Sequence, residues 1–561
     1  MTTVLVLGRE WEIDRGRRIW GTGGWLSPEE REAIDWITLV RLLGWRAEAA
    51  PVAGGERPDV CIVANDPTGE DGASLLEWAR LGTTVVAPYE SAPPSLRTGL
   101  TAVRSANGRS VRWRGGGAPA SWTAGVDVAH TALGPGTGWE VLAEVDGSGT
   151  VAARRHGSGL LVLMGFDPSA ARDASGVMTA LLVHLLTYTA PTPVAWLDLA
   201  RTVVLRMDDP GSGQSVYCRD WCYPKLTSAQ WGEVGGILSR RRGRMSVAYS
   251  AGFVDDGDAG RGRLVVDGRE VPRSPGAVHP SPLVAYEDMT GHRPHAVYDF
   301  GDEYDGVTAL VAAGAGGVEL HGFTHVHPGY EEWAAAPDRY ENVDWYRELG
   351  PRASAALARL APGDHPLERG FSAIERWFGS PPTTLVCPGE EWTDETLEVA
   401  LDTGLSLVGS YYLALRHDDR FCWSTHVCSP YLDEPDARWF DSGLPVVGYM
   451  HDRDLVVNGV GWLDEWLSAW ESKGATRFAD YAWLAAALST PVEVDGVGGA
   501  GAVAAATEGL PPGGALRVKV RTGGPGRVVL RVAGRESPAV DTGGDVVALV
   551  TGTDQPPVVR S

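Results

Sequence analysis

Two adjacent carboxylates, Asp208 and Asp209, follow an apolar run and precede the turn-forming pair Pro210 and Gly211. Neighbouring residues on a strand point to opposite faces, so both acids reach one site only if the backbone bends there, which Pro-Gly allows. Two acids at a strand end suit a division of labour in which one holds a metal ion and the other takes a proton. Taken alone, the pair is explained equally well as a solvated turn.

Three histidines, His321, His325 and His327, lie close together directly after a second apolar run. The i, i+4 spacing of His321 and His325 puts both imidazoles on one face if the segment forms a helical turn. Neutral imidazoles are good ligands for Zn²⁺ and similar divalent ions. The cluster therefore predicts a divalent metal site, with Zn²⁺ as the expected ion and His327 in a structural or supporting role. A core or capping cluster is the alternative.

A third apolar run, residues 446–450, ends in His451 and is followed by Asp452. A histidine at a strand end can act as a general acid when a neighbouring carboxylate tunes its pKa. His451 is therefore the candidate proton donor of the same site. A buried histidine with satisfied hydrogen bonds is the competing interpretation.

These polar groups lie at the carboxyl ends of predicted strands, which is where (β/α) barrels place their active sites. The central part of the chain alternates short apolar runs with helical stretches, a pattern typical of a parallel sheet covered by helices. The strands predicted there span residues 203–207, 245–249, 318–320, 384–387 and 446–450. The stretch 250–300 between the motifs is expected to be loop-rich decoration over the mouth of the barrel.

Residues 200–488 resemble the polysaccharide deacetylase (NodB homology, carbohydrate esterase family 4-like) superfamily in the order of these motifs. The paired aspartates come first, the two spaced histidines follow about 110 residues later, and a strand-end histidine comes last. The resemblance implies a distorted (β/α)7 barrel and an enzyme that removes N-acyl groups from amino sugars with a divalent metal ion. Carried over by position, it makes Asp208 the general base, His451 the general acid, and Asp209, His321 and His325 the metal ligands.

The segment from Cys387 to Glu390 departs from this family, which usually shows an Arg-Pro-Pro-Tyr-type sequence at that point. The missing arginine normally orients the base, so its absence leaves open what tunes Asp208. Arg206, on the same strand as Asp208, is the candidate replacement. The residues predicted to contact substrate are Arg206, Glu390, Trp392 and Trp423.

Residues 1–192 alternate strand and helix patterns and predict a doubly wound parallel sheet. In pattern, this region resembles the glutamine-amidotransferase-like, flavodoxin-type domains that are attached to glycan enzymes. Such amidotransferases need a cysteine on a sharp strand-to-helix turn. The only cysteine here, Cys61, lies inside an apolar run with no Gly-rich turn. We therefore interpret Cys61 as a core residue and this domain as non-catalytic.

The last part of the chain, residues 489–561, has strand-like runs joined by Gly/Pro turns, which predicts a small β-sandwich. Two prolines in the segment 189–193 break the helix that precedes them, so a linker is expected there. The predicted domains are therefore residues 1–192, 193–488 and 489–561.

The composition excludes some classes of partner. The 561-residue chain has 72 acidic against 49 basic residues and a net charge of −23. Nucleic-acid and anionic-membrane binding both need a basic face, so neither is expected. The chain shows no secretory signal and no run of 18 apolar residues, which predicts a cytoplasmic protein without a membrane span. The expected partner is a small-molecule or oligosaccharide substrate, and the oligomeric state is left open.

Three functions fit these motifs. The first is a metal-dependent hydrolase that removes an N-acetyl or N-acyl group from an amino sugar, in a glycan or a glycosylated natural-product intermediate. The second keeps the metal but cleaves a non-sugar amide, such as an N-acyl amino acid, a peptide or a cyclic imide. The third is a carbohydrate-binding protein with a vestigial barrel. The presence of all four residues of the aspartate and histidine pairs counts against this function.

Overall fold

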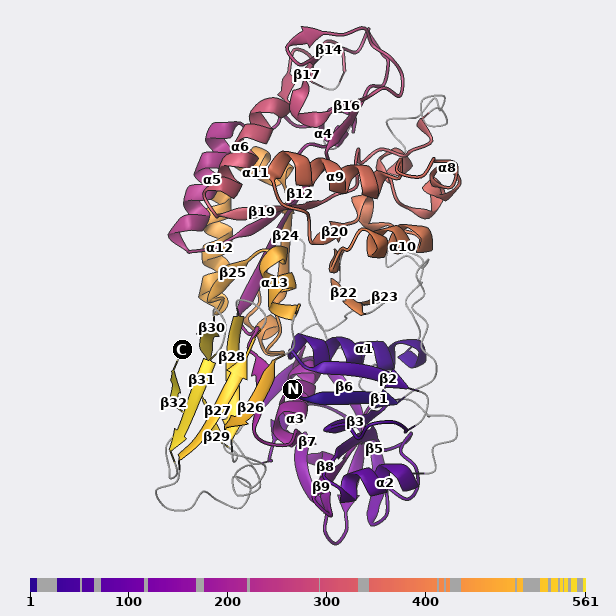
Figure 1. Ribbon diagram of the computed structural model, residues 1–561, viewed down its shortest axis with the longest axis vertical. Helices are drawn as coiled ribbons and strands as arrows, with labels where there is room; N and C mark the ends of the chain where they lie inside the picture. Colours follow the sequence, from indigo (N-terminus) through magenta and orange to yellow (C-terminus); the bar gives the residue numbers. More distant parts are fainter. Residues whose placement is uncertain are drawn as a thin grey trace.

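The computed structural model shows a mixed α/β protein with two large sheets, each containing a parallel core (Figure 1). The structure describes residues 1–7, 28–50, 53–64, 72–115, 120–167, 176–218, 222–291, 293–330, 343–410, 413–417, 420–423, 435–489, 492–497, 515–522, 526–532, 535–537, 539–542, 546–551 and 558–560. Within these residues, no helix is both long enough and apolar enough to cross a membrane.

The N-terminal sheet has nine strands and is parallel on one side only. Its parallel strands, in spatial order, are β2 (Arg46–Ala50), β1 (Thr3–Leu7), β3 (Val60–Val63), β4 (Thr84–Pro88) and β9 (Gly159–Met164). The antiparallel strands that follow are β8 (Ser148–His156), β7 (Glu140–Val145), β5 (Leu100–Trp113) and β6 (Ser121–Pro135). The sheet therefore contains the predicted parallel strands and is extended at one edge by antiparallel hairpins.

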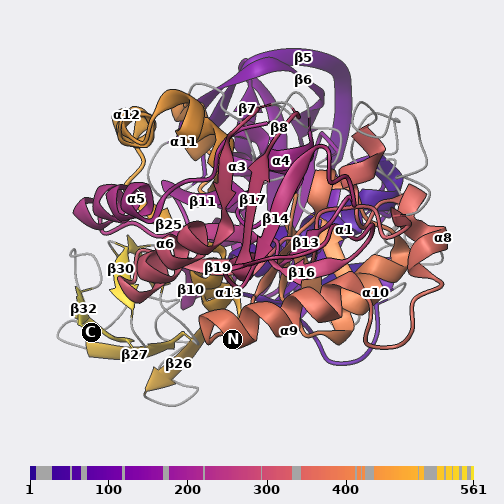
Figure 2. The same cartoon turned by 90° about the horizontal axis from the view of Figure 1, so that it is seen from above.

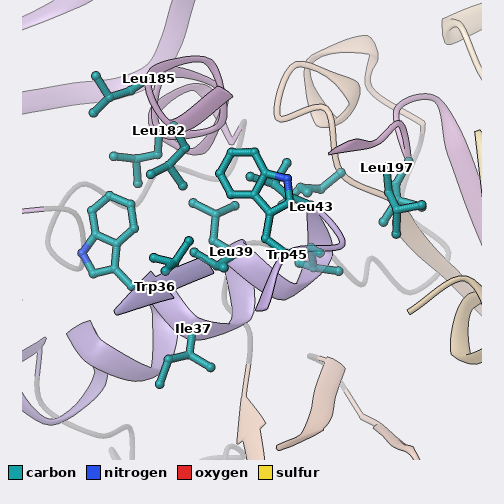
Figure 3. Close-up of a cluster of buried hydrophobic side chains, with 14 of the residues drawn as sticks. Trp36, Ile37, Leu39, Leu43, Trp45, Leu182, Leu185 and Leu197 are labelled. Carbon is teal, nitrogen blue, oxygen red and sulfur yellow. The ribbon is translucent and has the colours of Figure 1, made fainter. Parts of the chain in front are cut away.

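Helices cover both faces of the parallel half of this sheet. Helices α1 (Pro28–Leu42) and α3 (Val177–Thr189) share one apolar cluster with alternate strand residues such as Val6 and Ile62 (Figure 3). Helix α2 (Ala73–Arg80) packs on the other face. Cys61 lies fully buried in that second cluster, in the middle of β3, as expected for a core residue.

The central sheet carries the predicted motifs at its strand ends. Its strands, in spatial order, are β23 (Arg420–Trp423), β22 (Leu413–His417), β21 (Leu407–Gly409), β20 (Thr384–Val386), β19 (Gly316–Leu320), β12 (Met245–Tyr249), β11 (Thr202–Asp208) and β24 (Val446–His451), with β25 (Arg477–Ala479) also paired to β11. The six from β21 to β24 run parallel. Among the described residues no pairing joins β23 to β24, so the sheet is open and the predicted closed barrel is not formed by these hydrogen bonds.

Helices flank the central sheet on both sides when the molecule is seen from above (Figure 2). They are α5 (Ser228–Arg240), α6 (Phe300–Ala312), α9 (Pro366–Phe378), α10 (Asp394–Asp402), α11 (Asp452–Asn458), α12 (Gly461–Lys473) and α13 (Tyr481–Leu488). Helices α5, α6 and α12 share an apolar cluster with β11 and β12. This cluster holds the strands in place, so their carboxyl ends are fixed relative to one another.

The segment between β12 and α6 is more ordered than the predicted loop-rich decoration. It forms one strand pair, β13 (Gly252–Val254) with β16 (Val278–Pro280), and a small sheet of β14 (Gly262–Val266), β15 (Arg269–Glu270), β17 (Val284–Asp288) and β18 (Val297–Asp299). Buried aromatic rings of Phe253, Tyr286 and Tyr298 fill its core. The Ser281 hydroxyl ties it to the strand ends by donating to Gly211 O at 2.9 Å.

Two four-stranded antiparallel sheets are formed by the C-terminal strands. One contains β26 (Glu493–Val497), β27 (Ala515–Arg521), β31 (Val546–Thr551) and β32 (Val558–Arg560). The other contains β28 (Gly526–Val532), β29 (Arg535–Glu536), β30 (Val540–Thr542) and β10 (Val194–Leu197). Strand β10 therefore pairs with C-terminal strands, although the predicted boundary at residue 193 assigns it to the central domain.

Candidate metal and hydrolytic site

Asp209, His321 and His325 meet at the carboxyl edge of the central sheet. One possible ligand atom from each of the three lies within 4.8 Å of the other two. The Oδ1 atom of Asp209 is 3.4 Å from Nε2 of His321 and 3.3 Å from Nε2 of His325. All three side chains are buried. One carboxylate and two imidazoles form a donor set that suits Zn²⁺ and similar ions, which take at least one further ligand in catalytic sites.

The bend that brings Asp209 into this cluster occurs directly after β11. Asp208 is the last strand residue, Asp209 takes a left-handed φ of 80°, and Gly211 has a φ of 79°. A left-handed conformation is costly for a residue other than glycine and is found where surrounding structure enforces it. The predicted backbone bend after the strand is therefore present. Burial alone would raise the pKa of Asp209, but hydrogen bonds from the two imidazoles bring it well below its usual range.

The segment after β19 brings the two histidines together without a helical turn. Gly322 and His325 have φ values of 67° and 61°, and this irregular loop turns both imidazoles towards Asp209. Nδ1 of His321 lies 2.8 Å from the carbonyl oxygen of Val386, so Nδ1–H donates there, and Nε2, which faces Asp209, is the ring nitrogen left to bind a metal ion once it gives up its proton. We refer to residues 321–325 as the His loop.

His327 lies outside the cluster. Its Nε2 is 3.1 Å from Arg352 O, and its Nδ1 accepts from the backbone N–H of Gly329. These contacts fit the predicted structural role, because both ring nitrogens are occupied by local backbone groups.

Asp208 is held by Arg206, which is fully buried two residues earlier on β11. Arg206 Nε lies 2.8 Å from Oδ1 of Asp208, and Nη2 lies 2.6 Å from Oδ2. The same Nη2 is 2.5 Å from Oε1 of Glu390. Burial alone would raise the pKa of Asp208, but the Arg206 charge outweighs burial and lowers it. Asp208 is therefore ionised at neutral pH and fixed in orientation, as a general base requires.

Two of the predicted substrate contacts are buried in this structure. Arg206 has no exposed surface, and its guanidinium group contacts Asp208. Trp392 packs in an apolar cluster with Leu320 and Leu349.

The other two predicted substrate contacts have different outcomes. Glu390, with a φ of 57°, directs one oxygen to Arg206, and its side chain remains 12% exposed. Trp423 ends β23, and its side chain falls outside the described residues.

His451 stands beside Asp208, because the two are register partners on the adjacent strands β24 and β11. Its side chain is 18% exposed, against 3% to 5% for those of Asp208, Asp209 and the two cluster histidines. Burial alone would lower the pKa of His451, but Asp454, Asp209 and Asp208 outweigh burial and raise it to about 9. His451 therefore carries a proton at neutral pH, which is the form that a general acid needs.

A second group of buried charges adjoins the site and was not predicted from the sequence. Lys225 Nζ lies 3.0 Å from Oδ2 of Asp452 and 3.2 Å from Oε1 of Glu303, and all three side chains are buried. The Tyr223 hydroxyl donates to the other oxygen of Asp452. Glu303 Oε2 accepts from the backbone N–H of Gly211 at 2.8 Å, which fixes the turn after Asp209. Burial raises the pKa of Glu303 to about 8 even though Lys225 opposes it.

The fold and this site together define a mixed α/β protein with a buried Asp-His-His cluster between a fixed carboxylate and a protonated histidine. No protein-family model matches the chain, and no curated protein matches it.

Solved structures show only weak likeness. An exo-beta-1,4-mannosidase from an Opitutaceae bacterium matches at 14% identity over 33% of this chain, with a TM-score of 0.23. This chain spans about a third of that enzyme's length (34%). A CE4 family pseudoenzyme from Bacillus anthracis matches at 10% identity over 51% of this chain and 66% of its own, with a TM-score of 0.26. Likenesses of this strength carry no argument about activity.

Proposed function

We propose that this chain is a metal-dependent amide hydrolase that removes an N-acetyl or other N-acyl group from an amino sugar. The amino sugar would belong to a glycan or to a glycosylated natural-product intermediate. The observation that carries the proposal is the convergence of Asp209, His321 and His325 beside Asp208 and His451. These residues come from three separate strand ends, and together they supply metal ligands, a base and an acid.

The residues that would hold the metal ion are Asp209, His321 and His325, and Zn²⁺ is the expected ion. A bound divalent ion in such a site polarises an acyl carbonyl and lowers the pKa of water. The donor set fits this ion because both imidazoles present Nε2 to the Asp209 carboxylate. His321 is further oriented by Val386 O, as is common for metal-binding histidines.

Two proton transfers are assigned to the chain's own groups. Asp208, kept ionised by Arg206, takes the proton of the attacking water. His451, with a pKa of about 9, gives its proton to the nitrogen of the departing amine. An amine leaves poorly without that proton, so loss of His451 is expected to slow the reaction as severely as loss of Asp208.

The amino-sugar assignment depends on the resemblance of the motif order to polysaccharide deacetylases. The altered segment at Cys387 leaves a non-sugar amide as the alternative substrate class. A vestigial carbohydrate-binding site is disfavoured because the buried carboxylate and imidazoles would have no ligand to offset the cost of their burial.

The test is a panel of N-acetylated amino sugars and N-acyl amino acids, assayed for released acyl acid with the Zn²⁺-loaded full-length chain. Release from the sugars, abolished in Asp209→Ala, is the expected result. If acyl acid were released from the N-acyl amino acids alone, the substrate would be a non-sugar amide and the amino-sugar assignment would be wrong. Metal analysis that finds no ion in the wild-type chain, together with no release from any substrate, would leave the vestigial interpretation.

A further inference from the structure

Glu348 is a buried carboxylate that holds the His loop without belonging to the cluster itself. It lies between the short helices η2 (Val343–Tyr346) and η3 (Pro351–Ala353) and is 1% exposed. Its Oε2 accepts from the backbone N–H groups of Phe323 at 2.8 Å and His325 at 3.1 Å. Its Oε1 accepts from the backbone N–H of Thr324 at 2.9 Å and from the Thr324 hydroxyl at 2.7 Å.

The His loop needs a hydrogen-bond acceptor at the position of the Glu348 carboxylate to keep its conformation. Three consecutive N–H groups converge on one position, an arrangement that binds anions, and here the anion is a side chain of the same protein. Burying those N–H groups unpaired would be unfavourable, and His325 is also held in a left-handed conformation. Gly322 is required as well, because a Cβ there would lie 2.1 Å from Oε2 of Glu348.

Glu348 is unsuited to being a fourth ligand. Each of its oxygens already accepts two hydrogen bonds, all from the His loop. Whatever it contributes to metal binding must pass through the position of His325. Such indirect partners commonly change metal affinity by about 10- to 100-fold when removed.

We propose that Glu348 is a positioning residue that sets the metal affinity of the site by holding the His loop in the conformation that directs His325 at Asp209. The proposal rests on the metal site of the proposed function, but it concerns the carboxylate that shapes the loop, which none of the predicted motifs contains. It therefore adds a determinant of metal binding that lies 23 residues beyond His325 in the sequence.

The experiment titrates Zn²⁺ alone into the metal-free, full-length protein against a chromophoric chelator. Glu348→Ala is expected to weaken Zn²⁺ binding by about 10- to 100-fold. Glu348→Gln keeps the shape but turns an amide group towards N–H donors, and it is expected to weaken binding by about 10-fold. The spectrum of bound Co²⁺ should change in both variants, because it reports ligand geometry and a merely destabilised fold would not alter it.

Asp288→Asn is the matched control. Asp288 is also fully buried and also accepts from loop N–H groups, those of Gly291 at 2.6 Å and Arg293 at 2.9 Å, but these belong to the small sheet of β14 to β18. This variant is expected to lose stability and to keep the wild-type Zn²⁺ affinity and Co²⁺ spectrum.

The outcomes separate the two proposals. If the wild-type chain binds Zn²⁺ while Glu348→Gln keeps the same affinity and Co²⁺ spectrum, the positioning role is wrong and the metal site stands. If Glu348→Ala fails to fold, the Zn²⁺ affinity and Co²⁺ spectrum of Glu348→Gln test the positioning role. If the wild-type chain itself binds no more Zn²⁺ than Asp209→Ala, the metal site of the proposed function is wrong, and the role of Glu348 with it.

Discussion

The two large sheets each contain a parallel core, but they differ in where their ion pairs lie. In the described part of the N-terminal sheet and its helices, ion pairs such as Arg80–Glu77 and Arg109–Asp127 lie in solvent, with every side chain more than half exposed. At the strand ends of the central sheet they are buried, as in Arg206–Asp208 and Lys225–Asp452. Moving paired charges out of water is unfavourable, so their burial distinguishes this sheet edge as the candidate functional site.

The backbone shows the same contrast. In the N-terminal sheet the described left-handed residue other than glycine is Asp146, in the tight turn between β7 and β8. At the central site Asp209, His325 and Glu390 all take this conformation, and none lies in a hairpin turn. Strain that surrounding contacts impose at a cluster of polar side chains is characteristic of functional sites. The two sheets therefore differ most in the conformation and charge of the residues just beyond their strand ends.

Asp208→Asn, at the site of the central sheet, is expected to have the largest effect, which is a loss of turnover. The amide has the same shape but cannot take a proton, so turnover should fall by about 10²- to 10⁴-fold. Zn²⁺ binding should stay near the wild-type level, because Asp208 is not among the three ligands. Acyl release and Zn²⁺ titration measure the two quantities separately. Full activity in this variant would contradict the assignment of the base.

Lys225→Met tests the stability of the buried charges. The change leaves Glu303 and Asp452 buried without their cation, and it is expected to lower the free energy of unfolding by about 3–5 kcal/mol. Urea denaturation followed by tryptophan fluorescence at neutral pH measures the loss. A loss below about 1 kcal/mol would mean that the buried and exposed pairs do not differ as proposed.

His184→Phe tests the one strongly shifted histidine near the N-terminal sheet. His184 packs its ring edge-on to Trp113 at 4.8 Å, and burial lowers its pKa to about 4, with help from Arg531. A depressed pKa gives stability that is present above the unfolded value near 6.5 and lost as pH falls towards 4. Between pH 6.5 and 4.5 the wild type should lose about 2 kcal/mol more than the variant. Parallel pH curves for the two proteins would refute the assignment.

Arg80→Gln is expected to have the smallest effect. Arg80 and Glu77 form an exposed i, i+3 pair on α2, with Nη2 of Arg80 2.6 Å from Oε1 of Glu77. Exposed pairs of this kind contribute about 0.5 kcal/mol or less and are screened by salt. Denaturation at low salt should show only a small difference from wild type, and this difference should shrink further at high salt. If Arg80→Gln lowered the free energy of unfolding as much as Lys225→Met does, the buried and exposed ion pairs of the two sheets would not differ in their contribution to stability.

Much of the strand pattern could be predicted because apolar runs and Gly/Pro turns are local signals. The strand at Met245–Tyr249 was predicted with its observed bounds. Arg206 was recognised only as a candidate, although period-2 alternation already places it on the same strand face as Asp208. The i, i+4 spacing of His321 and His325 indicated that the two imidazoles could share one site, but spacing alone does not reveal the left-handed residues that shape the loop.

Other features depend on contacts between distant parts of the chain. Glu348 and Lys225 carry no motif, and their importance appears only when the fold brings them to the His loop and to Asp452. The openness of the central sheet likewise depends on which strand edges pair. Trp392 was predicted to contact substrate because aromatic residues suit sugar rings, but packing against Leu320 buried it.

Strand β10 has a consequence for how the protein is made. Its partner β28 follows more than 300 residues later, with Val194 opposite Arg531 and Leu197 opposite Val528. At a synthesis rate of about 5–20 residues per second, the edge of β10 stays unpaired for roughly 20 to 70 seconds before β28 leaves the ribosome. During that time Leu197 and its neighbour Leu43 lack the covering that Val528 and Leu530 later provide in the same cluster. The nascent chain therefore carries an open strand edge until its last tenth is translated, and an unpaired strand edge is a template for pairing with other chains.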